Sequence, residues 1–269
     1  MFRFFFVIII SMPFIIYYLG VGRYVERHAD RYDELARYKI AKKVIRILRY
    51  NGGVITRVYG RENLPKSGGY IMYSNHQGKY DALGIMYGHP TPCTILMDEK
   101  RSRLPIVNPF MDLIKGSRLK KEDIKSQVMT IRKIVDEVKE GRKYIIFPEG
   151  GYDDNRNNVQ DFHSGSFKCA VRSKCPIVPV AIIDSYKVFE SMAPSPVRTK
   201  VIFLPSINYE EYKDMTTEQI AEIVRARIMV TIAMYTRKRQ IKQLDMTLNA
   251  NVSDVEEARR YINRLRYVL

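Results

Sequence analysis

A histidine and an aspartate five positions apart are the first candidates for catalytic residues in this sequence. They bound the segment His76-Gln77-Gly78-Lys79-Tyr80-Asp81. On a continuous helix, at about 3.6 residues per turn, two such side chains would point roughly 140° apart. We therefore expect His76 to precede a helix and Asp81 to lie on its first turns, facing back. The carboxylate can then bond one imidazole nitrogen and leave the other as a general base for an alcohol. Alone, this spacing is also compatible with a structural histidine.

A second polar segment, Phe147-Pro148-Glu149-Gly150, follows another run that reads as a strand. It predicts a carboxylate on a tight turn, where backbone amides lie open to a ligand. The alternative is a plain turn with an exposed acid. Because functional residues of open α/β sheets gather beyond the carboxyl ends of strands, two such segments favour one common site.

Alternating β-rich and helical stretches predict an α/β domain, a mixed β-sheet covered by helices. Helices are expected at about 123–140, from the capping-box pattern Thr216-x-x-Gln219, and from Ser253-x-x-Glu256. The predicted strands are Val54–Tyr59, Tyr70–Ser74, Thr94–Met97, Tyr144–Phe147, Ile177–Ile183 and Val201–Leu204. We divide the chain into an N-terminal membrane anchor with a basic amphipathic helix (1–50), an α/β core (51–212) and C-terminal helices (213–269).

The N-terminal segment Phe4–Val21 carries no charge and is about long enough to cross ~30 Å of hydrocarbon. No small-residue cleavage site follows it, which favours a retained anchor over a removed signal peptide. The basic stretch that comes next carries apolar residues at helical spacing between Leu35 and Leu48. It predicts an amphipathic helix on anionic headgroups that keeps the domain on the cytoplasmic face. A helix packed on the core with a solvated basic face is the alternative.

The net charge of +16 implies an anionic partner: nucleic acid, an acidic membrane or a phosphorylated substrate. No zinc-finger spacing or aromatic RNA-binding signature is present, which argues against nucleic acid. Cys93, Cys169 and Cys175 are irregularly spaced, and neither a disulfide framework nor a metal site is expected. We expect Cys169 and Cys175 to be buried packing residues rather than nucleophiles, and a covalent route through Ser74 is disfavoured.

Together these segments resemble the glycerolipid acyltransferase family that includes the bacterial 1-acylglycerol-3-phosphate acyltransferases. The family motif Asn-His-x4-Asp matches Asn75, His76 and Asp81, and Phe-Pro-Glu-Gly matches Phe147, Pro148, Glu149 and Gly150. A later Val-Pro motif matches Pro176 to Val180. The resemblance covers roughly residues 50–210, and each motif is less specific than the combination.

The resemblance implies acyl transfer from acyl-carrier protein or a coenzyme A thioester to a lysophospholipid, with no metal or other cofactor. His76 and Asp81 are then the catalytic residues. The substrate-binding candidates are Asn75, Phe147, Pro148, Glu149 and Gly150, with Lys100, Arg118 and Lys121 as cations for the acceptor phosphate. The chain departs from the family where an arginine is usual: Lys121 stands at one such place and Tyr152, after Gly151, at another.

The expected function is acylation of the sn-2 hydroxyl of 1-acylglycerol 3-phosphate, giving phosphatidic acid at the cell membrane. Acylation of a different lysophospholipid is the nearest alternative, because of the missing arginines. A non-catalytic membrane-surface binding protein and a thioester hydrolase are the others. The absence of a Gly-x-Ser-x-Gly elbow argues against the hydrolase.

Overall fold

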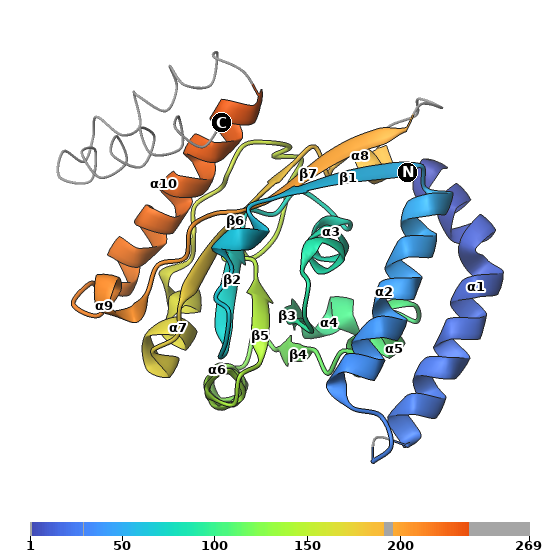
Figure 1. Ribbon diagram of the computed structural model, residues 1–269, viewed down its shortest axis with the longest axis horizontal. Helices are drawn as coiled ribbons and strands as arrows, with labels where there is room; N and C mark the ends of the chain where they lie inside the picture. The colour runs from blue at the N-terminus through green and yellow to red at the C-terminus, as the bar shows by residue number, and fades with distance from the viewer. Residues whose placement is uncertain (1, 29, 191–195, 237–269) are drawn as a thin grey trace.

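A mixed sheet forms the centre of the protein (Figure 1). The computed structural model describes residues 2–28, 30–190 and 196–236. Within them, seven strands lie in the order β1-β7-β6-β2-β5-β3-β4. Neighbours from β6 to β4 are parallel, whereas β7 runs antiparallel to β6 and parallel to β1. The strands are β1 (Val54–Tyr59), β2 (Tyr70–Ser74), β3 (Thr94–Asp98), β4 (Ser117–Leu119), β5 (Lys143–Ile146), β6 (Ile177–Ile183) and β7 (Val197–Phe203).

Helices cover both faces of the sheet, which explains why its central strands are apolar throughout. In β2, Ile71 and Tyr73 pack into one core, and Tyr70 and Met72 pack into the other. The first core includes α6 (Ile124–Lys139), α7 (Lys168–Ser173) and α10 (Thr217–Thr236). The second includes α2 (Glu34–Asn51), α3 (Asp81–Gly88) and α5 (Val107–Leu113). The other helices are α1 (Phe2–Arg27), α4 (Glu99–Ser102), α8 (Lys187–Glu190), α9 (Tyr209–Tyr212) and the 3₁₀ turns η1 (Arg61–Asn63) and η2 (Ser164–Phe167).

The parallel direction of β2, β5 and β6 brings the loops that follow them to one end of the sheet. These loops hold residues 75–80, 147–163 and 184–186. Because β1 runs the other way, its first residue, Val54, lies at this same end. We call this end the catalytic end, after the catalytic residues His76 and Asp81 that the sequence predicts there, and the loops of three different strands meet at it.

The predicted helix starts are confirmed where the structure describes them. Thr216 and Gln219 form the expected reciprocal cap: the Thr216 amide donates to the Gln219 side chain at 2.9 Å, and the Gln219 amide donates to the Thr216 hydroxyl at 3.3 Å. Asp123 caps α6 by accepting from the Ser126 amide at 3.0 Å. The capping box expected at Ser253 lies outside the described residues. α10 packs into the same core as β6, so the third predicted unit begins with a helix of the central domain.

Polar side chains join α2 to α3, the helix that carries Asp81. The Tyr38 hydroxyl donates to the Met86 carbonyl at 2.9 Å, and the Lys42 ammonium donates to the carbonyls of Tyr87 and His89. These bonds use side chains from the inward face of α2, while its basic residues Lys39, Lys43 and Arg46 lie exposed on the outward face. The predicted amphipathic helix is therefore present, and it packs on the core as well.

Candidate active site

His76 and Asp81 form a hydrogen-bonded pair with the predicted geometry. His76 lies in the loop after β2, and Asp81 is the first residue of α3. The imidazole Nδ1 donates to Asp81 Oδ2 over 2.7 Å. This bond fixes the tautomer with the proton on Nδ1 and leaves Nε2 as the basic nitrogen.

The Asp81 carboxylate is fully buried and bonded on both oxygens. Oδ2 also accepts the backbone amides of Gln77 and Gly78, at 2.5 and 2.9 Å. Oδ1 accepts the hydroxyl proton of Ser185, from the loop after β6. Four donors to one carboxylate favour its ionised form, which offsets the cost of burying the charge. Asp81 therefore stands behind the imidazole with hydrogen-bond donors on both of its oxygens.

Two aromatic rings hold the His76 ring in place. Phe147 stacks on it with ring centroids 4.3 Å apart and planes 19° apart. Tyr152 meets it edge-on at 4.6 Å and 74°. The guanidinium of Arg101, on α4, lies 5.7 Å from the centre of the Tyr152 ring. His76 thus sits between two rings from the loop after β5, next to an exposed cation.

Glu149 joins the loop after β5 to the loop after β2. Its Oε1 accepts the His76 amide at 3.1 Å, and its Oε2 accepts the Asn155 side chain at 3.2 Å. Asn155 also donates to the His76 carbonyl at 2.9 Å. Burial, with a smaller contribution from the nearby Asp81 charge, raises the pKa of Glu149 to about 8. At neutral pH this carboxyl is therefore largely protonated.

The remaining motif residues take structural positions around this pair. The Asn75 side-chain amide donates to the Ile182 carbonyl at 3.0 Å and accepts the Ile182 backbone amide at 2.8 Å, and so joins β2 to β6. The Pro148 carbonyl accepts the His163 amide at 2.9 Å. Gly150 has a positive φ of 71°, and a Cβ there would lie 3.0 Å from the His163 ring. Only glycine fits this turn without strain.

The three predicted phosphate cations are in different situations. Lys121 lies beside the site, because its ammonium donates to the Gly150 carbonyl at 2.6 Å. Lys100 is exposed and pairs with Glu122 at 2.7 Å. Arg118 is bound by Asp112 and Asn108. The structure thus brings Lys121 to the Glu149 loop, and it gives Lys100 and Arg118 protein partners of their own.

The alternative nucleophiles are poorly placed. Ser74 is fully buried, with its hydroxyl bonded to the Asn75 carbonyl at 3.1 Å. Cys169 and Cys175 are buried in the core, as predicted, and burial raises the pKa of their thiols to about 12 and about 11. Across the described residues, no group of three or more His, Cys, Asp or Glu side chains is placed to hold a metal ion.

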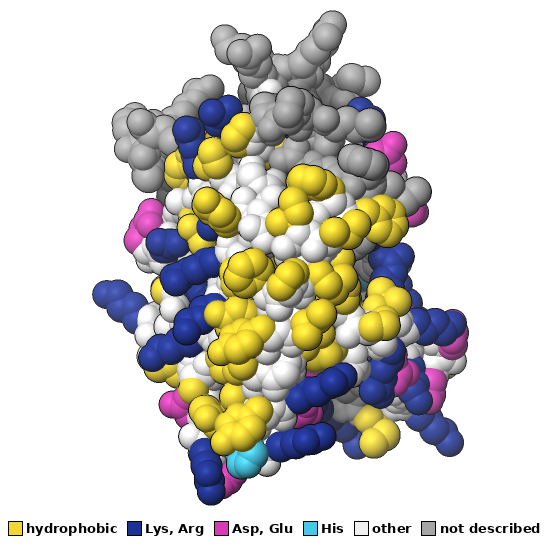
Figure 2. All heavy atoms as spheres, turned by 90° about the vertical axis from the view of Figure 1, so that its right-hand side faces the viewer, with side chains coloured by type: hydrophobic (Ala, Val, Ile, Leu, Met, Phe, Trp, Pro, Cys, Tyr) yellow, Lys and Arg dark blue, Asp and Glu magenta, His cyan; other side chains and the backbone are white. Residues whose placement is uncertain are grey.

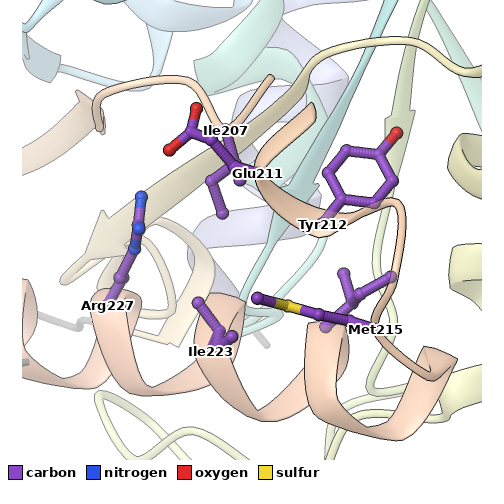
Figure 3. A pocket seen from close by; sticks show the side chains of 7 residues that line it. Ile207, Glu211, Tyr212, Met215, Ile223 and Arg227 are labelled. Atoms are coloured by element: carbon purple, nitrogen blue, oxygen red, sulfur yellow. The ribbon is translucent and has the colours of Figure 1, made fainter. Parts of the chain in front are cut away.

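A small hollow of about 20 Å³ between α9 and α10 lies away from the pair (Figure 3). Ile207 lines it and pairs with Ile177, the first residue of β6. The first residue of β6 is at the opposite end of the sheet from His76. The hollow therefore belongs to the packing of the last helices and not to the site around His76.

The sequence analysis did not single out Ser185, Tyr152, Arg101 or Asn155 as site residues. Each lies outside the matched motifs, in a loop or a short helix. Tyr152 had one signal, as the residue that departs from the expected pattern after Gly150. Arg101 also had a signal, as one of the basic residues between the two motifs, of which one or two were expected in the site. Ser185 and Asn155 reach the site only through the packing of strands and loops, which no local spacing encodes.

Comparisons with known proteins agree with this geometry. The sequence model of the family described as Acyltransferase matches residues 55–183, which include both motif segments. The matched segment, just under half of the chain, is similar to an acyltransferase domain. The domain begins in β1 and ends with β6, so it contains every strand whose loop contributes to the pair.

Relatives from distant organisms share this region. The chain is 27% identical to a 1-acyl-sn-glycerol-3-phosphate acyltransferase of Borreliella burgdorferi over 190 residues, 69% of this chain and 74% of that one. It is 29% identical to the enzyme of the same name from Saccharomyces cerevisiae over 155 residues, 57% of this chain and 51% of that one. The chain thus spans between half and three quarters of these two relatives.

A solved structure shares the acyltransferase fold. The crystal structure of the 1-acyl-sn-glycerophosphate (LPA) acyltransferase, PlsC, from Thermotoga maritima matches with a TM-score of 0.73 and 21% identity. The match covers 88% of this chain and 96% of that one. At this identity the likeness establishes the fold alone.

Proposed function

We propose that this acyltransferase moves a fatty acyl group from an acyl-carrier-protein or coenzyme A thioester to the sn-2 hydroxyl of 1-acylglycerol 3-phosphate, giving phosphatidic acid. The observation that carries the proposal is the His76–Asp81 pair in the matched domain, with Nδ1 bound to a buried carboxylate at 2.7 Å. The names of the relatives support this acceptor.

The pair performs the transfer by general base and then general acid catalysis. His76 Nε2 takes the proton of the acceptor hydroxyl as its oxygen attacks the thioester carbonyl carbon. The Asp81 anion stabilises the imidazolium that forms. The tetrahedral intermediate then breaks its carbon–sulfur bond, and the leaving thiolate recovers the proton from His76. The products are an ester and a free thiol.

The acceptor phosphate has two cations close to this pair. Lys121 reaches the Gly150 carbonyl, and the exposed Arg101 lies over the ring that touches His76. Both are able to approach an anion on the exposed side of the imidazole. In 1-acylglycerol 3-phosphate the sn-2 hydroxyl is on the carbon next to the one that bears the phosphate, so cations beside the imidazole favour a phosphorylated glycerol as the acceptor.

A different lysophospholipid is the second candidate acceptor, and one observation favours it. The residue after Gly151 is the aromatic Tyr152, and two of the predicted phosphate cations already have acidic partners. A larger headgroup that stacks on an aromatic ring would suit this surface better than a bare phosphate.

The outward face of α1 supports docking on a membrane. The helix is long and apolar enough to cross a bilayer by length and composition. One side packs on the protein through Val7, Ile15 and Val25, and the other exposes its large apolar residues. Figure 2 shows these side chains gathered along one face of the molecule, with lysines and arginines beside them. The exposed residues are Phe5, Phe6, Ile9, Ile10, Phe14, Ile16, Tyr17 and Tyr24.

We propose that α1 lies in the plane of one leaflet, the cytoplasmic one, and does not cross. It packs side by side with α2 (Figure 1). A crossing α1 would carry the basic residues of α2 into hydrocarbon, where each charge costs about 2.5–3.5 kcal/mol or more. In-plane docking buries the apolar face and leaves the bases at the headgroups. A groove of about 510 Å³ between α1 and α2, lined by Phe14, Arg46 and Arg49, lies beside Val54 at the catalytic end.

The test is acyl transfer in detergent micelles with radiolabelled acyl thioesters and a panel of lysophospholipids. Wild type is expected to form phosphatidic acid from 1-acylglycerol 3-phosphate, and His76→Ala is expected to lose about 10³-fold in rate because the base is gone. His28→Ala, which changes a partly exposed histidine directly after α1, serves as the matched control and should retain activity. Preference for another headgroup would establish the second candidate, and thioester cleavage without lipid product would contradict both.

A further inference from the structure

Ser185 contacts the catalytic pair from a third strand. It follows β6, which pairs with β2 so that Val180 lies beside Ser74. The residue before it, Asp184, has a positive φ of 62°, a left-handed conformation that aspartate tolerates better than most residues. This turn directs Ser185 back toward α3, where its hydroxyl donates to Asp81 Oδ1. Ser185 is 2% exposed, so water does not compete for this bond.

The contacts of Asp81 show what the Ser185 hydroxyl contributes. Oδ2 already accepts three donors: the His76 ring and the amides of Gln77 and Gly78. Among the described residues, Ser185 is the donor bonded to Oδ1. The χ2 angle of aspartate is broad, and rotation about it moves both oxygens together. The Ser185 bond to Oδ1 therefore adds a restraint, from the opposite oxygen, on the direction in which Oδ2 meets the imidazole.

A network of side chains fixes Ser185 in turn. Its amide donates to Gln77 Oε1 at 3.0 Å. Gln77 Nε2 donates to the Ile182 carbonyl at 3.0 Å and to Asn157 Oδ1 at 2.9 Å. Asn157 Oδ1 also accepts the Asp184 amide at 2.9 Å. The Ser185 hydroxyl lies 3.3 Å from Gln77 Oε1 as well, but its single proton goes to the charged acceptor, which is the stronger one.

We propose that Ser185 is a positioning residue of the transfer reaction: its hydroxyl fixes the orientation of Asp81, which in turn holds His76 at the angle that aims Nε2 at the acceptor hydroxyl. This inference rests on the proposed function. A positioning residue that touches no substrate should act on turnover and leave substrate binding unchanged. Small errors in the alignment of a base cost about 10- to 100-fold in rate.

The experiment compares two substitutions that separate the hydroxyl from the volume of the side chain. Ser185→Cys nearly keeps the volume but replaces a strong donor with a weak one. It is expected to lower kcat about 10- to 100-fold while KM for the lysophospholipid stays within about threefold. Ser185→Thr keeps the hydroxyl and is expected to retain kcat within about threefold, although its extra methyl group lowers the melting temperature.

A matched control is another buried serine outside the site. Ser173, on α7, donates to the carbonyls of Cys169 and Ala170 at 2.7 and 3.2 Å. Ser173→Cys should change stability and leave kcat unchanged. Melting temperatures of all variants show which of them fold.

The outcomes distinguish this inference from the proposed function. A folded Ser185→Cys variant with wild-type kcat would overturn the positioning role, because the hydroxyl would then have no effect on turnover. Equal losses of kcat in the Cys and Thr variants would also overturn it, because they would indicate an effect of packing alone. If wild type transfers no acyl group to any lysophospholipid, the proposed function fails and this inference fails with it.

Discussion

Glu149 is the residue of the site whose ionisation should affect the stability of the whole protein. Burial raises its pKa to about 8 in the folded state, whereas an unfolded chain gives an ordinary glutamate value near 4.5. The folded protein therefore holds a proton that the unfolded chain releases at lower pH. Its contribution to stability is complete below about pH 4.5 and is lost as the pH rises through 8.

We predict that unfolding free energy falls between pH 5 and pH 8.5 and that Glu149 accounts for a loss on the order of 3 kcal/mol. Glu149→Gln cannot ionise, so its stability should fall less over this range, even though the amide loses one of the two hydrogen bonds at the site. Denaturant unfolding at both pH values measures the difference. The exposed Glu140→Gln is the control and should follow wild type. Parallel pH curves for wild type and Glu149→Gln would contradict the prediction.

At the scale of single residues, the sequence predicted the centre of the site better than its surroundings. His76, Asp81 and Glu149 were placed correctly because each directly follows, or lies a short turn after, a strand whose apolar pattern is unambiguous. Tyr152 and Asn155 lie in a loop with no regular pattern. Their contacts with His76 depend on how that loop folds back, and hydrophobic periodicity contains no information about such a path.

At the scale of elements, the orientation of α1 can be tested, because in-plane docking and crossing place its residues at different depths in the bilayer. The chain contains no tryptophan, so one introduced tryptophan reports its own depth. Phe6, Phe14 and Tyr24 are about half exposed along the outward face. At 1.5 Å per residue they extend over about 27 Å of helix.

We predict that Phe6→Trp, Phe14→Trp and Tyr24→Trp are quenched at one shallow depth, about 5–10 Å below the headgroups. Lipids brominated at different chain positions measure this depth. A crossing helix would instead place Phe14→Trp near the bilayer centre and the other two near the interfaces. Ile124→Trp, on the exposed side of α6, is the control and should not be quenched.

The bounds of some strands were predicted correctly and those of others were not, for physical reasons. β1, β2 and β6 have the predicted bounds because their apolar runs coincide with strands. β4 was missed, since Ser117–Leu119 is a short polar edge strand with a single neighbour, β3. β7 begins at Val197 rather than Val201, because its first residues alternate between buried and exposed sides beside β1. The antiparallel pairing of β6 with β7 is a long-range contact, and the residues of these strands do not encode its direction.

At the scale of the whole molecule, the net charge of +16 is distributed so that the face proposed to dock on the membrane is basic as well as apolar. Lys39, Lys43 and Arg46 occupy one exposed stripe of α2, next to the apolar face of α1. Each basic residue near an anionic bilayer contributes about 1 kcal/mol to binding, and this attraction decays within a Debye length. Apolar contact from α1 is not screened by salt.

We predict two separable contributions to membrane binding, which vesicle co-sedimentation can measure. Raising the salt from about 0.05 to 0.5 M should weaken binding to vesicles of mixed phosphatidylglycerol and phosphatidylcholine, and it should leave the weaker binding to pure phosphatidylcholine unchanged. Lys43→Gln with Arg46→Gln should reduce the affinity for the anionic vesicles about tenfold or more.

The matched control removes the same charge from a different face: Lys125→Gln with Arg132→Gln, both exposed on α6. If net charge alone drives the attraction, both pairs of substitutions weaken binding equally, and the basic stripe of α2 has no special role. If only the α2 pair weakens it, the protein approaches the bilayer with α1 and α2 first. Because Val54 and the groove between α1 and α2 lie at the catalytic end, that orientation also brings His76 toward the leaflet that holds its lipid acceptor.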